Sequence, residues 1–238
     1  MAGGGGDWRA RTRASNNAGV TLPCVAGAAA AWQAWGMKPP ARSRAERPAG
    51  KPPDLSRLRE AALAHLARFS ATEAGLRRVL ERRVDRWARR AEAEGTPRED
   101  LAEAVRAGRA AAAEVARAMV ANGSVNDAAF AEARARRLAR TGRSRRAIGA
   151  HLAGKGIAAE TAAAALPTDA ESELDAALAH CRRRRVGPFA RTPMEAPARL
   201  KALGSLARGG FARAVAERAL DMDTDAAEER ILARRAHG

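Results

Sequence analysis

The sequence predicts an all-α protein: three tandem three-helix repeats form an elongated, curved body behind a disordered N-terminal tail. Helix caps and glycine stops follow one another at short intervals from about residue 55 onward. Hydrophobic residues make up 46% of the chain, but many of them are alanine, which favours helix and buries little area. Several small cores are therefore expected rather than one large core.

The stretch between Ala112 and Leu166 predicts four short helices. Asn122-Gly123 ends the first, because glycine just past a helix end adopts left-handed geometry at little cost. Asn126 and Ser144 are typical N-caps for the second and third helices, and Gly154-Lys155-Gly156 is a turn before the fourth. The helices are predicted to end near Val120, near Arg140, near Leu152 and at Leu166.

The chain resembles itself at an offset of 54 residues. Leu152 to Leu166 aligns with Leu206 to Leu220, with seven identities in fifteen positions, four of which are alanine. A weaker copy lies upstream, where Ser70-Ala71-Thr72-Glu73 has the pattern of a capping box ahead of a leucine-rich helix. Three related helical units are therefore predicted.

We therefore expect four segments. They are a disordered or mis-annotated N-terminal extension over 1–54, helical repeat 1 over 55–104, helical repeat 2 over 105–167, and helical repeat 3 with an acidic C-terminal tail over 168–238. Met37 is a credible internal start. The apolar stretch from Val20 to Trp35 is interrupted by Pro23 and is too short for a membrane-spanning helix, so no membrane association is expected.

The charge balance favours a polyanionic partner. The chain has 43 Lys+Arg against 27 Asp+Glu, a formal charge of +16 and a pI of about 11.5. A GC-rich genome is an equally good explanation for the preference for arginine over lysine. It does not explain the excess of positive charge.

Arginine clusters are the candidate functional residues. Arg136 and Arg140 are four residues apart on a predicted helix, as are Arg78 and Arg82, so each pair projects to one side where phosphates or carboxylates can bind. The alternative for any single arginine is a solvated helix face. The candidate contacts are Arg77, Arg78, Arg82, Arg83, Arg136, Arg140, Arg145, Arg146, Arg182, Arg183, Arg184 and Arg185.

Enzymatic motifs are not recognisable in the sequence. Gly149 to Gly156 approaches a phosphate-binding loop, but Gly156 stands where a Ser or Thr should bind magnesium, and a helix precedes the loop instead of a strand. The four histidines show no metal-ligand spacing, and Cys24 and Cys181 lie far apart. We expect no catalytic residue, cofactor or metal, no disulfide, and a reducing cytoplasm as the location.

Residues 58–220 resemble the RecX regulatory proteins, which modulate the RecA recombinase. The carriers are Ala62 to Leu66 and Leu76 to Leu80 in the first repeat, and in the second Gly123 to Ala131, Arg145 to Ile148 and Leu152 to Ile157. Asn126-Asp127 stands where the family's pattern has an acidic pair, and the stretch from Gly187 to Pro197 resembles an insertion.

The resemblance implies a protein that lies along the RecA–DNA filament and modulates the recombinase, in the direction of inhibition, in DNA repair, recombination and the SOS response. The partners it implies are the RecA filament and, through electrostatics, single- or double-stranded DNA, with the protein acting as a monomer. Two alternatives remain. One is a stand-alone basic helical module that binds nucleic acid, and the other is a membrane- or export-linked protein, which depends only on the first 35 residues.

Overall fold

The computed structural model describes residues 48–236, and over this range all regular structure is helical, which confirms the all-α prediction. The predictions for residues 1–47 lie outside the described residues. The elements are α2 (Leu55–Leu66), α3 (Glu73–Ala93), α4 (Arg98–Ala121), α5 (Asp127–Arg140), α6 (Arg145–Gly154), α7 (Ala159–Ala165), α8 (Ala170–Arg184), the 3₁₀ helix η1 (Gly187–Phe189), α9 (Ala196–Arg208), α10 (Arg213–Leu220) and α11 (Thr224–Ala236).

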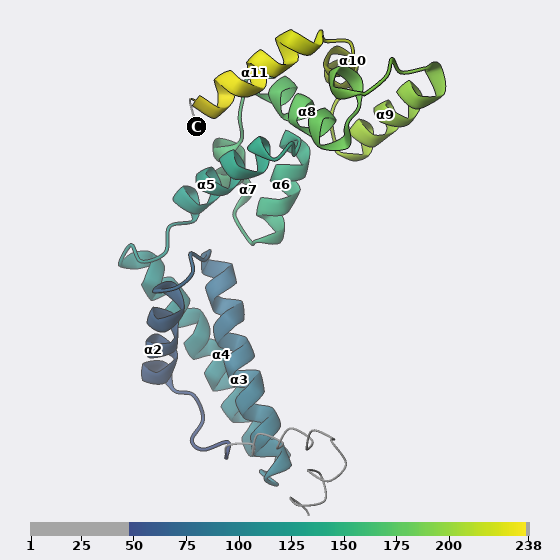
Figure 1. The fold of residues 1–238 in the computed structure, drawn as a ribbon. Coiled ribbons are helices and arrows are strands. Elements are labelled where there is room, and N and C mark those ends of the chain that lie inside the picture. The colour runs from purple at the N-terminus through teal and green to yellow at the C-terminus, as the bar shows by residue number, and fades with distance from the viewer. Residues whose placement is uncertain (1–47, 237–238) are drawn as a thin grey trace, which may run out of the picture. The chain divides into compact units, whose positions relative to one another are not determined.

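The helices form three units (Figure 1). Each unit has its own hydrophobic cluster. The first unit contains α2, α3 and α4 around Leu80 and Met119. The second contains α5, α6 and α7 around Leu152, and the third contains α8 to α11 around Leu178 and Leu206. Small separate cores fit a sequence in which large apolar side chains are scattered among alanines.

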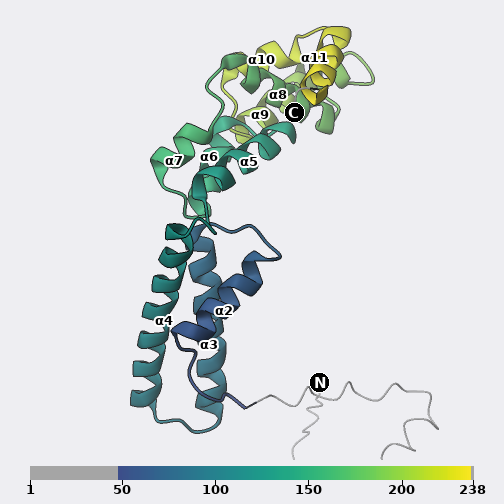
Figure 2. The same cartoon turned by 90° about the vertical axis from the view of Figure 1, so that its left-hand side faces the viewer.

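The expected boundary between residues 104 and 105 falls inside α4, which belongs wholly to the first unit. In Figure 2, α4 runs beside α3, and its buried Ala112, Val115 and Met119 pack in the first unit's cluster. The cause is the length of α3, which spans 21 residues and delays the turn to Gly95, at φ +86°. The predicted first helix of repeat 2 is thus the third helix of the first unit.

Several predicted helix starts agree with the structure. The Asn126 side chain accepts a hydrogen bond from the Ala129 N–H at 2.9 Å, and the Ser144 side chain accepts one from the Ala147 N–H at 3.1 Å. The cap of α3 is different from the expected box, because Thr72 rather than Ser70 occupies the N-cap and accepts from the Gly75 N–H at 3.0 Å.

The 54-residue offset corresponds to equivalent turns in the second and third units. Gly156 has φ +83° and Gly210 has φ +89°, a conformation that favours glycine. The residue after each turn, Ile157 or Phe211, is buried in the cluster of its unit. The sequence similarity at the 54-residue offset therefore corresponds to a backbone turn that recurs in both units.

Neighbouring units are joined by a pair of hydrogen bonds. In the first joint, between the first and second units, the Thr72 hydroxyl donates to the Lys155 carbonyl at 2.8 Å. The next residue along, Glu73, donates its N–H to Asp127 Oδ1 at 2.9 Å. Thr72 is 2% exposed, and its buried hydroxyl has two hydrogen-bond partners. It accepts the capping bond from the Gly75 N–H and donates across the joint to the Lys155 carbonyl.

The second joint, between the second and third units, repeats this arrangement. The buried Ser144 hydroxyl donates to the Gly209 carbonyl at 2.6 Å, and the Arg145 N–H donates to Glu173 Oε2 at 3.0 Å. In both joints the cap of a second helix binds the carbonyl just before the turn glycine of the next unit. A cap hydroxyl can serve both ends because it donates and accepts at once.

Residues 48–53, named here the N-terminal strap, differ from the disordered extension expected over 1–54. The Trp87 indole N–H donates to the Gly50 carbonyl at 3.0 Å, and the Ala49 N–H donates to Glu94 Oε1 at 2.7 Å. Pro53 is buried, and Asp54 caps α2. The described part of the extension is therefore packed on α3.

The expected acidic tail after Leu220 forms helix α11. Ala227 and Ile231 of this helix are buried in the third unit's cluster. Arg230 pairs with Asp175 of α8 at 2.7 Å, so a basic residue of the tail meets an acidic residue of the body. The tail is thus a fourth helix of the third unit.

Candidate functional site

All twelve candidate arginines are exposed on the surface. They come from α3, from α5 and α6, and from the end of α8. A guanidinium carries a permanent positive charge and five N–H donors. The structure therefore leaves each of them accessible, although several also have contacts within the chain.

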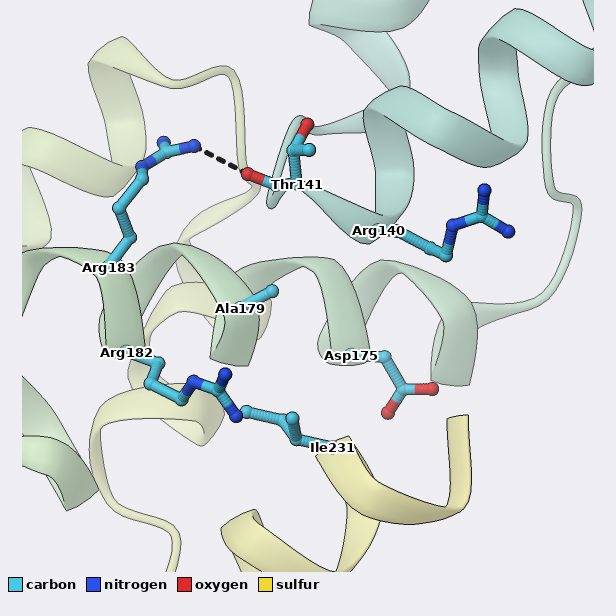
Figure 3. A pocket seen from close by; sticks show the side chains of 7 residues that line it. All are labelled: Arg140, Thr141, Asp175, Ala179, Arg182, Arg183 and Ile231. Atoms are coloured by element: carbon cyan, nitrogen blue, oxygen red, sulfur yellow. Dashed lines mark hydrogen bonds between the residues drawn. The ribbon is translucent and has the colours of Figure 1, made fainter. Parts of the chain in front are cut away.

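The structure brings Arg140, Arg182 and Arg183 together at one groove, named here the arginine groove (Figure 3). Its volume is about 500 Å³, and α5, α8 and α11 contribute to its lining. The residues lining it are Arg140, Thr141, Asp175, Ala179, Arg182, Arg183 and Ile231. Two arginine clusters that are about forty residues apart in the sequence thus share one surface feature.

The charges of the arginine groove are predominantly positive. Asp175 is the one acidic residue in its lining, and Arg230 pairs with this carboxylate at 2.7 Å. Arg230 also lies 2.9 Å from Glu171, and these carboxylates raise its already high pKa although burial acts against them. The carboxylate of the groove's lining is thus paired with Arg230 of α11.

Arg183 also has a structural role. One of its guanidinium nitrogens donates to the Thr141 carbonyl, which ties α8 to the end of α5. Another lies 3.4 Å from the ring nitrogen Nδ1 of His180. Arg182 lines the same groove but does not hold the Thr141 carbonyl, so its charge is the cleaner target for substitution.

The remaining candidates lie outside this groove. Arg136 pairs with Glu132 on its own helix at 3.7 Å, and Arg77 pairs with Glu81 at 3.5 Å. Arg78 donates to the Lys155 carbonyl at 3.1 Å, so it belongs to the first joint. The others are Arg82, Arg83, Arg145, Arg146, Arg184 and Arg185.

Two further grooves contain basic residues outside the candidate set. Arg134 and Arg137 line an open groove of about 530 Å³ together with Phe69, which is 60% exposed, and Phe130. A second, smaller groove in the first unit contains Arg83 with four other cations. The helical spacing of Arg83, Arg86 and Arg90 was a usable signal for the second groove.

Buried titratable groups lie next to the arginine groove. Burial, with help from the charges of Arg183 and Arg184, lowers the pKa of His180 below its usual value near 6.5. Burial raises the pKa of the adjacent Cys181 thiol to about 12. That thiol therefore stays protonated and unreactive at neutral pH.

Residues 48–236 contain neither a metal-ligating cluster nor a membrane-spanning helix. No group of three or more His, Cys, Asp or Glu side chains there is placed to hold a metal ion. Between residues 48 and 236 no helix is both long and apolar enough to span a bilayer.

Tandem three-helix units with an arginine-lined groove define a basic helical-repeat protein. Residues 126–166, the second unit, match the family described as RecX, second three-helix domain. Over 167 residues the chain is 38% identical to Regulatory protein RecX of Myxococcus xanthus (strain DK1622), covering 69% of this chain and 84% of that relative. The chain belongs to the RecX family, whose members are regulatory proteins and not enzymes.

A second relative is similar over a shorter range. Regulatory protein RecX of Agrobacterium fabrum (strain C58 / ATCC 33970) is 34% identical over 106 residues, which is 44% of this chain and 56% of that protein. These similarities confirm the resemblance that the motifs indicated.

Proposed function

We propose that this protein binds the RecA–DNA filament and modulates the recombinase, in the direction of inhibition. Its membership of the RecX family supports this proposal, and the arginine groove is the observation that carries it. The proposed place of action is the cytoplasm, and the proposed acting form is a monomer. Size-exclusion chromatography with light scattering checks the monomer.

The arginine groove has the chemistry for an anionic surface. Arg140 and Arg182 come from different units, so an anionic surface that covers the groove contacts both units. Guanidinium groups bind either anion through paired hydrogen bonds. The groove thus fits two features of a nucleoprotein filament, the phosphates of its DNA and acidic patches of its protein.

The test is the RecA-dependent ATPase on single-stranded DNA, measured with the parent and with Arg140→Glu/Arg182→Glu across a salt series. We expect the double reversal to remove most of the inhibition. Arg183 is left intact because it supports Thr141. The matched control is Arg106→Glu/Arg117→Glu, which reverses two exposed arginines of α4 outside the described grooves.

The outcomes separate the possibilities. A folded double variant that inhibits as well as the parent excludes the arginine groove from the interface. If the parent leaves the ATPase unchanged, the regulatory proposal itself fails.

The second candidate function is a stand-alone nucleic-acid-binding module, favoured by the net charge of +16. It predicts binding to bare DNA that is as tight as binding to RecA-coated DNA. Comparing the two affinities at one salt concentration decides between them, because phosphate contacts weaken steeply with salt. Tighter binding to the coated DNA supports the filament proposal.

A further inference from the structure

The N-terminal strap and α3 enclose a small, strongly basic groove in the first unit. Its volume is about 190 Å³, and its lining includes five cations and no acidic residue. The cations come from three segments: Lys51 from the strap, Arg57 from α2, and Arg83, Arg86 and Arg90 from α3. None of them belongs to the arginine groove.

The groove is built by specific contacts of the strap. Trp87 is 8% exposed and its N–H donates to the Gly50 carbonyl at 3.0 Å, while Arg57 donates to the Lys51 carbonyl at 3.2 Å. Gly50 has φ +63°, which allows the strap to turn toward α3. These bonds hold the strap, and with it Lys51, against the arginines of α3.

The arrangement is electrostatically unfavourable unless an anion is present. Arg83, Arg86 and Arg90 lie at positions i, i+3 and i+7 of α3 and therefore share one face. Within the described residues, none of the three has an ion pair. Like charges gathered in one concave site repel one another and attract an anion.

The state of Trp87 indicates which part of a nucleic acid can bind. Its ring is buried and its only donor is occupied by Gly50, so it is not available to stack on a base. The groove is also lined mainly by charged side chains, which do not suit an apolar side chain of a peptide. Phosphate is the anion that suits several guanidinium groups on one face.

We propose that this groove binds the backbone phosphates of a nucleic acid, independently of base sequence. This binding rests on the proposed function and adds to it, because it gives the first unit an attachment to DNA that is separate from the arginine groove. The regulator then contacts DNA through α3 whether or not the recombinase is present.

The test is binding to a fluorescent oligo(dT) without recombinase, followed by anisotropy across a salt series. In Arg83→Gln/Arg86→Gln/Arg90→Gln, glutamine removes the charges and keeps most of each stem. Three lost contacts should flatten the slope of log affinity against log salt by about 2, at about 0.7 per phosphate of a single strand. If the parent and the triple variant bind oligo(dT) equally at 1 M salt, the variant binds it roughly 100-fold more weakly than the parent at 0.1 M salt.

The matched control is Arg68→Gln/Arg106→Gln/Arg117→Gln, which removes three exposed charges of the first unit outside the groove. We expect it to change the slope by much less than the groove variant. Trp87→Phe keeps an aromatic ring but loses the indole N–H and with it the bond to Gly50, so it should weaken binding without removing any charge. Should the triple variant unfold, Arg86→Gln alone is expected to lower the slope by about 0.7.

A folded groove variant that binds oligo(dT) like the control would overturn the inference. So would a variant that keeps the parent's slope on bare DNA but binds the RecA filament less well, since the groove would then contact protein. Loss of the slope in a protein that leaves the RecA ATPase unchanged supports the groove and contradicts the proposed function instead.

Discussion

Each of the two joints between neighbouring units has the same kind of hydrogen-bond pair, but the residues packed around the pair differ. At the first joint, the Cβ of an alanine at position 156 would lie 2.3 Å from the Cβ of Ala74, and Arg78 donates to the Lys155 carbonyl. At the second joint, backbone meets backbone, because a Cβ on Gly142 would lie 2.6 Å from the His180 nitrogen. The second joint therefore includes a close backbone approach in addition to the shared bonds.

The second joint also contains a histidine that links its parts. His180 is 5% exposed, its ring packs edge-on against Phe211 at 5.8 Å, and its Nε2 lies 3.2 Å from the Ser205 hydroxyl. Arg183 connects the same region to the Thr141 carbonyl. The comparison teaches that the shared bonds align successive units, and that the local packing around them sets how firmly two units hold together.

The largest expected effect is at Gly142. Gly142→Ala should destabilise the protein by about 2–5 kcal/mol. This is the sum of the cost of placing alanine in the left-handed conformation and the cost of its overlap with the backbone of α8. Gly123→Ala is the matched control, since Gly123 has the same φ of +76° and nothing within 4 Å of its Cβ position. Equal losses in urea unfolding would show that the close approach adds nothing.

The shared hydroxyl bonds are tested by Ser144→Ala and Thr72→Val. Each change removes an N-cap and leaves a carbonyl across the joint without its donor, for an expected loss of about 2–3 kcal/mol. Asn126→Ala removes an exposed cap alone and should cost about 1 kcal/mol. The two joints are not equivalent if thermal unfolding shows that Thr72→Val destabilises the protein no more than Asn126→Ala does.

A smaller effect is expected from pH at the second joint. Because the folded-state pKa of His180 is lowered, its contribution is fully present above pH 6.5 and is lost as pH falls toward the lowered pKa. The melting temperature should therefore drop between pH 7.5 and 5.5, and His180→Gln should reduce that drop. His65→Gln, in the first unit, serves as the control, and identical pH profiles for parent and His180→Gln would contradict the expectation.

The smallest effect concerns Glu173, whose pKa is raised by burial although the Arg145 N–H acts against this. An acid with a raised folded-state pKa stabilises the fold below its usual value and loses that contribution as pH rises. Glu173→Gln should thus melt slightly higher than the parent at pH 7 and equally near pH 4, with exposed Glu228→Gln as control. A lower melting temperature at pH 7 would mean that the carboxylate charge strengthens the joint.

Local signals were predictable from the sequence, and long-range contacts were not. Asn126 and Ser144 were identified as caps because capping is a property of four adjacent residues. The assignment of α4 to the first unit escaped prediction, since it depends on which face of α4 meets α3. Phe130 is half-buried against the second unit's cluster, whereas Val125 packs in the first unit's cluster, a division that no local pattern indicates.

The site was predicted in part for the same reason. Helical spacing identified Arg140 and the run from Arg182 to Arg185, but their meeting at one groove results from the packing of α5 on α8. The strap was read as an extension because glycine and proline are typical of linkers. Its order comes from the bond between Gly50 and Trp87, 37 residues away, for which no local pattern exists.

The hydroxyl that aligns each unit with the next is missing at one position. Glu195 stands at the N-cap of α9, where Thr72 and Ser144 stand in the other two units, and its side chain makes no capping bond. An ionised carboxylate cannot donate a proton to a carbonyl. The N-cap of α9 therefore cannot make the hydroxyl-to-carbonyl bond that joins the first unit to the second and the second unit to the third.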